Sequence, residues 1–263
     1  MIENPKASRV RRVAALARKK DRLAAEQFLV EGPQAVRELL VHSPERAVAV
    51  YATIGNEPWQ FEIDRLADST DVEIIRVTDE VLAAMAETVQ PQGVLAVARI
   101  VRTQLHDALA GAKLVAVLQQ VRDPGNAGTV LRAADAAGAD AVIFAGESID
   151  PWHPKVVRST TGSLFHLPVV TAATLVEVID AARLAGLAVI AADVNGAELQ
   201  ASDADLSQPT AWVFGNEAHG LSVSDRALTD RALRLPIYGK AESLNLATAA
   251  SVCLYTTAFS QRG

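Results

Sequence analysis

The sequence predicts an α/β protein with two domains. Apolar runs typical of buried strands alternate along most of the chain with segments whose apolar residues recur at helical spacing. Such alternation indicates parallel strands covered by helices. The length of 263 residues corresponds to about two domains. A segment of weaker periodicity, residues 101–112, separates two alternating regions and is interpreted as a linker.

Residues 1–100 are expected to form the smaller α/β domain. Asn4 and Pro5 predict a helix start, and an apolar stripe with arginines on the other faces follows. The further elements predicted here are strands at 28–30, 47–54, 72–77 and 93–100, and helices at 33–40, 59–67 and after Thr78. No catalytic cluster is evident, so this domain is interpreted as a binding or support module.

Residues 113–263 are expected to form the second domain, around a parallel sheet. The strands predicted here are 114–118, 141–145, 187–192, 211–214 and 234–237. The helices predicted between and after them are 126–137, 154–161, 175–185, 222–228 and 244–260.

Composition favours a soluble cytoplasmic protein with a local polyanion contact. No apolar run reaches the roughly 18 residues of a membrane span, and no secretion-signal pattern is visible. Residues 1–30 contain eight basic and three acidic side chains, although the whole chain has a net charge of −6. This basic arm favours contact with RNA or DNA, and a solvated helix face is the alternative.

Residues 119–138 contain the first stretch with polar side chains at a strand end. Asp123-Pro124-Gly125-Asn126 is typical of a turn, and Asn126 can cap the helix that follows. Arg132 then lies in the second turn of this helix. An amide and a guanidinium just beyond a strand end are placed to meet a ligand. An ordinary strand–turn–helix with a solvated arginine is the alternative.

Two later stretches repeat this pattern. In residues 212–222 a buried strand runs into Gly215, which allows close backbone approach to a ligand, and Glu217 follows. In residues 235–247, Ser243 and Asn245 precede a helix whose first N–H groups need partners. Taken alone, Glu217 could be a solvated or capping residue and Ser243 a simple helix cap.

Common cofactor, hydrolase and metal motifs are absent from the sequence. It has no P-loop, Rossmann glycine fingerprint, nucleophile elbow or zinc-protease motif. The five histidines show no metal-ligand spacing, so no metal is expected. His219 lacks an evident orienting partner, and Cys253, the one cysteine, lies in an apolar run and is expected to be a buried thiol.

Together, the three stretches resemble the three motifs of the SpoU (TrmH-like) RNA ribose 2′-O-methyltransferases, within the SPOUT superfamily. The matching residues are 126–128 with Arg132, then 214–217, then 235–237 with 243–245. The sequence departs from the family at Ala218-His219, where many relatives have glycine after the glutamate, so the local loop shape is in question.

The N-terminal region also resembles that family's substrate-binding domain, which is similar to a small ribosomal-protein fold. The matching residues are 4–6, 19–22, 28–32 and 92–94.

The resemblance implies a trefoil knot in the C-terminal domain, S-adenosylmethionine as cofactor, and a homodimer with the site at the interface. The implied catalytic residues are Arg132, Asn126, Glu217, Ser243 and Asn245. The implied cofactor-binding residues are Phe214, Gly215, Asn216, Leu235, Ile237, Ser243 and Leu244. An arginine base is awkward at a pKa above about 12, so we expect Arg132 to bind phosphate and stabilise the developing alkoxide.

The expected reaction is methylation of a ribose 2′-OH, with 23S-type ribosomal RNA as the favoured substrate by analogy with the N-terminal domain. A tRNA methyltransferase and a non-catalytic RNA-binding or ribosome-assembly protein are the alternatives. The residues expected to contact RNA phosphates are Arg9, Arg11, Arg12, Lys19, Lys20 and Arg22, with Lys155 and Arg158 nearer the site.

Overall fold

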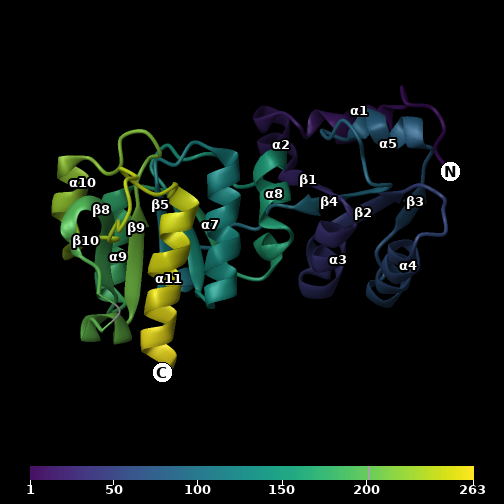
Figure 1. The fold of residues 1–263 in the computed structure, drawn as a ribbon. Coiled ribbons are helices and arrows are strands. Elements are labelled where there is room, and N and C mark those ends of the chain that lie inside the picture. The colour runs from purple at the N-terminus through teal and green to yellow at the C-terminus, as the bar shows by residue number, and fades with distance from the viewer. Residues whose placement is uncertain (201) are drawn as a thin grey trace. The chain divides into compact units, whose positions relative to one another are not determined.

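The computed structural model describes residues 1–200 and 202–263 of the protein. Its contacts divide the chain into two compact units (Figure 1). Unit 1 comprises residues 1–101 and 152–166, and unit 2 comprises residues 102–151 and 167–263. The segment 152–166 lies in sequence between two strands of unit 2 but packs as part of unit 1. Within the described part of the chain, no helix has the length and apolar character needed to cross a membrane.

Unit 1 is built on a mixed four-stranded sheet with the order β1-β4-β2-β3. Strand β4 pairs antiparallel with both β1 and β2, and β2 pairs parallel with β3. The strands are β1 (Gln27–Glu31), β2 (Ala47–Ala52), β3 (Ile74–Arg76) and β4 (Val94–Arg99). The helices are α1 (Ser8–Ala15), α2 (Lys19–Ala25), α3 (Pro33–His42), η1 (Pro44–Arg46), α4 (Pro58–Thr70), α5 (Asp79–Met85), α8 (Pro154–Thr160) and η2 (Ser163–Phe165).

The apolar stripe predicted near the N-terminus is part of the core of unit 1. Val10, Val13 and Leu16 pack with residues of α5 against one face of the sheet. Phe28, at the start of the edge strand β1, stacks on Phe165 of the 152–166 segment at a centroid distance of 6.3 Å. That segment therefore contributes buried aromatic surface to unit 1.

Unit 2 is built on a six-stranded sheet with the order β10-β8-β9-β5-β6-β7, and every pair in it is parallel. The strands are β5 (Leu114–Gln119), β6 (Ala141–Ala145), β7 (Val169–Ala173), β8 (Ala188–Glu198), β9 (Thr210–Phe214) and β10 (Arg231–Arg234). The helices are α6 (Leu105–Leu109), α7 (Pro124–Ala137), α9 (Leu175–Leu184), η3 (Ala204–Ser207), α10 (Val223–Leu228) and α11 (Leu246–Arg262). The parallel sheet expected from the alternation of strands and helices is confirmed.

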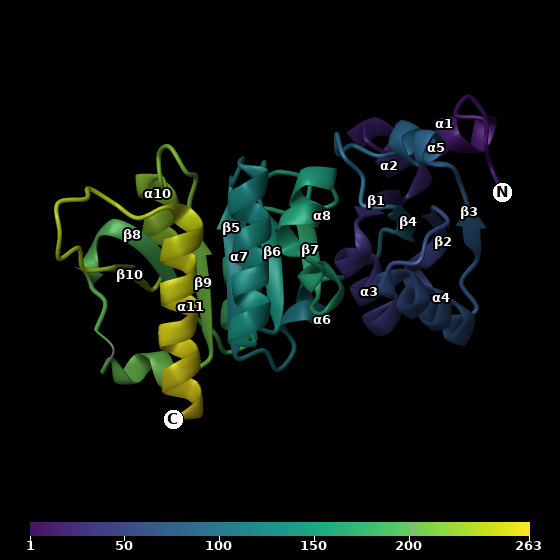
Figure 2. The same ribbon diagram turned by 45° about the vertical axis from the view of Figure 1, so that its right-hand side comes forward.

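Both faces of this sheet are covered by helices. Helices α7 and α11 lie side by side on one face, as Figures 1 and 2 both show. Trp212 of β9 is completely buried on that face and donates from its indole N–H to the Thr257 hydroxyl of α11 over 2.8 Å. On the other face, α6 and α9 pack against alternate strand residues such as Val117 and Val213. Burial on both faces explains why these strands are continuous apolar runs.

Several elements differ from the predicted ones. The first helix begins at Ser8 and not at Pro5, and neither α2 nor β7 was foreseen. Strand β8 runs on to Glu198, β10 begins three residues earlier than expected, and the predicted 154–161 helix belongs to unit 1. The last difference could not be predicted, because no pattern of neighbouring residues indicates on which sheet a short helix will pack.

Candidate active site

The site-bearing loops follow the carboxyl ends of the adjacent central strands β5 and β9. After β5 the chain continues outward to β6 and β7, whereas β8 and β9 lie on the other side of β5. The order of the sheet therefore reverses at this pair. Such a switch point leaves a crevice at the carboxyl ends of the strands, where ligands bind in open α/β sheets.

Asp123 begins α7, and this corrects the expectation that Asn126 could be the cap. The Asp123 side chain accepts a hydrogen bond from the Asn126 backbone N–H over 2.7 Å. Pro124 occupies the first turn, where its missing N–H has no cost. Because Asp123 satisfies the helix end, the side-chain amide of Asn126 is available for contacts with other loops.

The carboxylate of Glu217 holds the loop after β5 against the loop after β9. It accepts hydrogen bonds from the backbone N–H groups of Arg122 and Asp123 over 3.1 and 2.9 Å, and from Asn126 Nδ2 over 3.5 Å. Hydrogen bonds to an ionised acceptor are stronger than neutral ones. The structure thus gives Glu217 a positioning contact with the first motif.

Asn245 joins the third motif to the first. Its Nδ2 donates to Asn126 Oδ1 over 2.9 Å, and its own Oδ1 accepts from Ala247 N–H and Thr248 N–H at the start of α11. Asn245 is therefore the cap of α11. The alternative that Ser243 caps this helix is wrong, and Ser243 lies exposed in the preceding loop.

Gly215 and Asn216 fix the end of β9. A Cβ atom on Gly215 would lie 2.4 Å from the backbone carbon of Gly220, so glycine is required by this close approach. Asn216 donates from Nδ2 to the Gln120 carbonyl oxygen over 2.8 Å, at a residue held in the left-handed region with φ of +55°. The Asn216 hydrogen bond connects the ends of β9 and β5.

Arg132 lies on an exposed face of α7. Within residues 1–200 and 202–263, no acceptor lies at hydrogen-bond or ion-pair distance from its guanidinium. Ala136, one turn further along α7, accepts a hydrogen bond from the Tyr255 hydroxyl of α11 over 3.2 Å. Residues four apart share a helix face, so Arg132 is on the face that adjoins the exposed side of α11.

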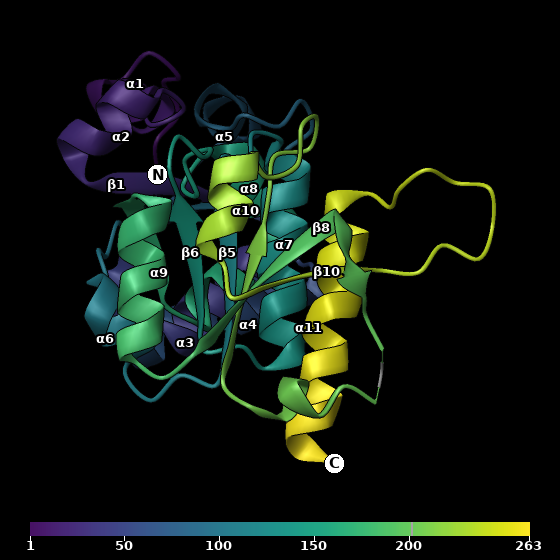
Figure 3. The same ribbon diagram turned by 90° about the vertical axis from the view of Figure 1, so that its left-hand side faces the viewer.

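The implied cofactor residues are in two different environments. Phe214 is buried in the core and stacks on Trp212, so only its backbone can face a ligand. Leu235, Ile237 and Leu244 lie in the loop between β10 and α11, which projects away from the sheet in Figure 3. Ile237 and Leu244 are 37% and 39% exposed, so this loop presents apolar surface to a ligand.

Most of the predicted RNA contacts in unit 1 are on the surface. Arg11, Arg12, Lys19 and Lys20 are exposed. Arg9 is half-buried and donates to the Tyr51 hydroxyl and to Glu73, which raises the pKa of its guanidinium, through the Tyr51 hydrogen bond above all.

Arg22 is the exception among the predicted RNA contacts. It is 1% exposed, and its guanidinium donates to the carbonyl oxygens of Leu16 and Ala17 over 2.9 and 2.6 Å. The prediction that it contacts phosphate is corrected, because this side chain holds α2 to the end of α1 instead. Helix periodicity alone could not distinguish it from its exposed neighbours.

Lys155 and Arg158 both lie on α8 in unit 1. Lys155 is exposed, whereas Arg158 pairs with the buried carboxylate of Glu31 over 3.1 Å. Glu31 also accepts from the hydroxyl and N–H of Thr88. Arg158 therefore holds α8 against β1, while Lys155 remains available to a polyanion.

Sequence reasoning missed a cluster in unit 1. Glu38, His42 and His166 bring a carboxylate oxygen and two imidazole nitrogens within 4.8 Å of one another. Glu38 and His42 are one helical turn apart, a spacing visible in the sequence once carboxylates are considered with histidines. His166 is 128 residues from Glu38, so its participation was not visible. His219, by contrast, is exposed in the loop after β9.

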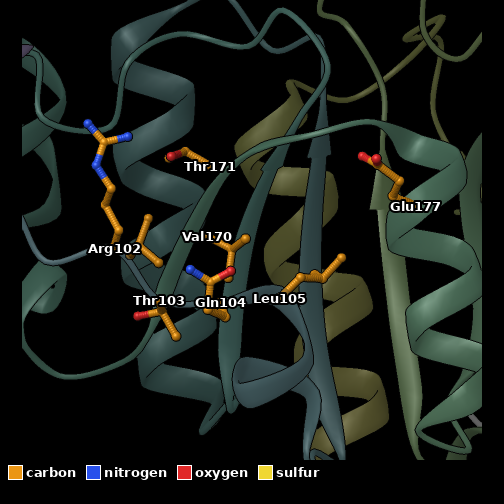
Figure 4. A pocket seen from close by; sticks show the side chains of 8 residues that line it. Arg102, Thr103, Gln104, Leu105, Val170, Thr171 and Glu177 are labelled. Atoms are coloured by element: carbon orange, nitrogen blue, oxygen red, sulfur yellow. The ribbon is translucent and has the colours of Figure 1, made fainter.

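A cavity of about 450 Å³ lies elsewhere in unit 2, at the edge strand β7. Figure 4 shows Arg102 and Glu177 on its two sides, with Val170 and Thr171 of β7 between them. The Glu177 carboxylate already accepts from the backbone and hydroxyl of Thr174, which lowers its pKa. The motif residues do not line this cavity, so it is separate from the candidate site.

The comparisons with known proteins agree with this geometry. Residues 113–255 match the model of the SpoU rRNA Methylase family, and residues 7–96 match the MRM3-like substrate binding domain. The chain therefore belongs to the SpoU rRNA methylase family, as its motifs predicted.

Characterised relatives match over nearly the whole chain. The 23S rRNA (guanosine(2553)-2′-O)-methyltransferase RlmP of Bacillus subtilis is 34% identical over 97% of each chain. The 23S rRNA (uridine(2479)-2′-O)-methyltransferase of Streptomyces viridochromogenes is 34% identical, over 92% of this chain and 86% of the relative. A crystal structure of the SpoU methyltransferase AviRb from the same organism, in complex with the cofactor AdoMet, has a TM-score of 0.84 at 32% identity and covers 97% of this chain and 99% of that one.

Proposed function

We propose that this protein transfers a methyl group from S-adenosylmethionine to a ribose 2′-OH of 23S ribosomal RNA. The observation that carries the proposal is the meeting of the three family motifs at the carboxyl ends of β5 and β9. Glu217, Asn126 and Asn245 form a continuous hydrogen-bonded chain across the loops after β9 and β5 and before α11. The near-full-length similarity to 23S rRNA ribose methyltransferases supports the RNA class.

The loop before α11 fits an adenosyl ligand in its chemistry. Such a ligand needs apolar surface for its base and polar groups for its ribose and amino-acid parts. Ile237 and Leu244 offer exposed apolar side chains, and Ser243 an exposed hydroxyl in the same loop. Gly215 leaves no room for a side chain at the neighbouring strand end. When bound, S-adenosylmethionine supplies an electrophilic methyl group.

The residues of this chain hold and polarise the ribose. Positioning of the 2′ oxygen can lower the activation free energy of methyl transfer by up to roughly 7–11 kcal/mol. Arg132 is exposed, so its guanidinium binds the adjacent phosphate and stabilises the negative charge that develops on the 2′ oxygen as the hydroxyl gives its proton to solvent water. Asn126, Glu217 and Asn245 act as positioning residues for the loops around that point.

Residues 1–100 then hold the RNA. Arg11, Arg12, Lys19 and Lys20 supply exposed positive charge next to one another on α1 and α2. Phosphate contacts of this kind fix an RNA without reading its bases, so the shape of a folded rRNA segment decides which ribose reaches Arg132.

A homodimer with the site at the interface is part of the proposal. Helix α11 exposes an apolar stripe of Val252, Tyr255 and Phe259, which are 42%, 38% and 70% exposed. Through the Tyr255–Ala136 hydrogen bond this stripe adjoins the face of α7 that bears Arg132. A second chain seated on the stripe would shield apolar surface and complete the surroundings of Arg132. Sedimentation analysis of Phe259→Asp, which places a charge in the stripe, tests the dimer.

The proposed reaction is tested by incubating purified protein with unmodified 23S rRNA, bulk tRNA and tritiated S-adenosylmethionine, followed by nuclease digestion and mass spectrometry. A 2′-O-methylated nucleotide in 23S rRNA is the expected result. Tritium found in tRNA alone would show that tRNA, and not 23S rRNA, is the substrate. Cofactor binding without label in either RNA would contradict the proposed substrate, and absence of cofactor binding would contradict the enzyme itself.

A further inference from the structure

Glu38, His42 and His166 form a three-sided cluster within unit 1. His42 Nε2 lies 3.2 Å from Glu38 Oε2, and His166 Nε2 lies 3.1 Å from the same oxygen. The two imidazole rings are 4.4 Å apart between centroids and meet edge to face. Both ring nitrogens therefore converge on one carboxylate oxygen.

The other oxygen of Glu38 is held by different donors. Gln34 Nε2 and an Arg37 guanidinium nitrogen reach Oε1 over 2.7 and 2.8 Å. These donors fix the orientation of the carboxylate and leave Oε2 facing the two rings. Ligating carboxylates in metal sites are oriented by outer hydrogen bonds in the same way.

We propose that Glu38, His42 and His166 bind a divalent transition-metal ion, zinc by preference, through Oε2 and the two Nε2 atoms. Two imidazoles and one carboxylate are a donor set that zinc accepts, with a fourth position taken by water. Bonds of about 2.0–2.2 Å in tetrahedral geometry separate ligand atoms by about 3.3–3.6 Å. The distances of 3.1 and 3.2 Å to Oε2 are slightly shorter, so a small outward movement of the two rings would admit the ion.

The carboxylate of the cluster is buried, and the two histidines are exposed. Glu38 is 7% exposed, and a Cβ on Gly162 would lie 2.3 Å from its Cγ, so the 152–166 segment passes tightly over α3 at a glycine with φ of +103°. The Ser43 hydroxyl, next to His42, donates to the carbonyl oxygen of Phe165, next to His166. Both histidines are thus placed by contacts of their neighbours in the chain.

The bound ion would tie the 152–166 segment to α3. Glu38 and His42 come from one turn of α3, and His166 ends the segment that the chain inserts between β6 and β7. Because metal binds a site that the unfolded chain lacks, its binding adds to the stability of unit 1. This role is independent of methyl transfer.

The proposal is tested on the full-length protein, without an affinity tag, after treatment with a chelator. Titration calorimetry with Zn²⁺ measures stoichiometry and affinity, and thermal unfolding is followed with and without the ion. We expect one Zn²⁺ per chain and a rise in Tm on its addition. His42→Ala and His166→Ala are expected to weaken binding at least tenfold and to abolish the rise in Tm.

His106→Ala is the matched control. The His106 ring also lies 3.0 Å from a carboxylate, that of Asp107, but both are exposed and belong to no three-residue group among the described residues. This variant should bind Zn²⁺ as the wild type does. Co²⁺ added to wild-type protein should give the visible absorption of a four-coordinate site, which requires no variant to fold.

Absence of saturable one-to-one Zn²⁺ binding would overturn the proposal. So would equal affinities for wild type and His42→Ala. A third result would also overturn it: both cluster variants have a lower Tm than the wild type, but Zn²⁺ changes the Tm of none of the three proteins. That result would assign the cluster to a hydrogen-bond network around Glu38.

Discussion

Asn245 donates a hydrogen bond from its side-chain amide to the side-chain carbonyl oxygen of Asn126, over 2.9 Å. The oxygen of the same Asn245 side chain accepts from two N–H groups at the start of α11. One side chain therefore caps α11 and links the first turn of α11 to the first turn of α7.

Asn245→Asp separates these two roles. Aspartate keeps a capping oxygen but has no donor for Asn126, so we expect the free energy of unfolding to stay within about 0.5 kcal/mol of the wild type. Methyl transfer should fall about tenfold, because Asn126 loses its fixed orientation. Asn245→Ala should lose activity and also about 1 kcal/mol of stability. Denaturant unfolding and single-turnover assays measure both, and an Asp variant with wild-type rates would refute the link.

Gly215→Ala should disturb the end of β9. Its added Cβ would meet the Gly220 backbone at 2.4 Å, which a backbone cannot accommodate without shifting. We expect a loss of about 1–3 kcal/mol in unfolding free energy and weaker S-adenosylmethionine binding by calorimetry. Gly239→Ala, with no atom within 4 Å of its added Cβ, is the control for stability and should unfold as the wild type does. Wild-type cofactor affinity in Gly215→Ala would be evidence against a site at Gly215.

Arg132→Lys tests the role of the guanidinium. Because Arg132 is exposed and unpaired among the residues that the structure describes, stability should change by less than about 0.5 kcal/mol. The single-turnover rate should fall about a hundredfold or more. The lysine ammonium lacks the planar set of N–H donors with which a guanidinium can bind phosphate and alkoxide at the same time. Cofactor affinity should be retained. Unchanged rates across pH would remove Arg132 from the mechanism.

Arg11→Glu with Arg12→Glu should weaken RNA binding in a salt-dependent way. Each lost phosphate contact lowers the slope of log affinity against log salt by roughly 0.7–0.9. Filter binding of an rRNA fragment at several salt concentrations measures the slope. Arg65→Glu with Lys113→Glu, at two exposed basic residues outside the arm, changes the net charge by the same amount and is the matched control. If both changes had the same effect, general charge and not the basic arm would account for binding.

Cys253 predicts a loss of stability at alkaline pH. Burial raises the pKa of its thiol from 9.0 to about 12. Between these values the folded state retains a proton that the unfolded chain releases, so the free energy of unfolding falls as pH rises, by up to about 1.4 kcal/mol per pH unit. Urea unfolding from pH 8 to 10.5 measures this slope. Cys253→Ala should have a shallower slope over the same range, and identical slopes would contradict the prediction.

Much of the fold followed from local sequence, because buried parallel strands are continuous apolar runs and helix starts have capping residues. The motif residues around Asn126 and Glu217 were found for the same reason, since strand ends and turns are local features. Contacts between residues far apart in the sequence could not be predicted in this way. The burial of Arg22 and the meeting of His166 with Glu38 depend on segments that no sequence window contains together.

The 152–166 segment has a consequence for how the protein is made. Phe165 stacks on Phe28, and Arg158 pairs with Glu31, so the N-terminal unit lacks part of its interior until residue 166 has left the ribosome. By then β5, α7 and β6 have already been synthesised. Domains usually fold in order of synthesis, but here the first unit can be completed only after two of the six strands of the second sheet have been made. A shortened chain ending before residue 152 would therefore yield neither unit intact, and the linear cut at residue 112 that the sequence suggests would leave this segment without the surface on which it packs.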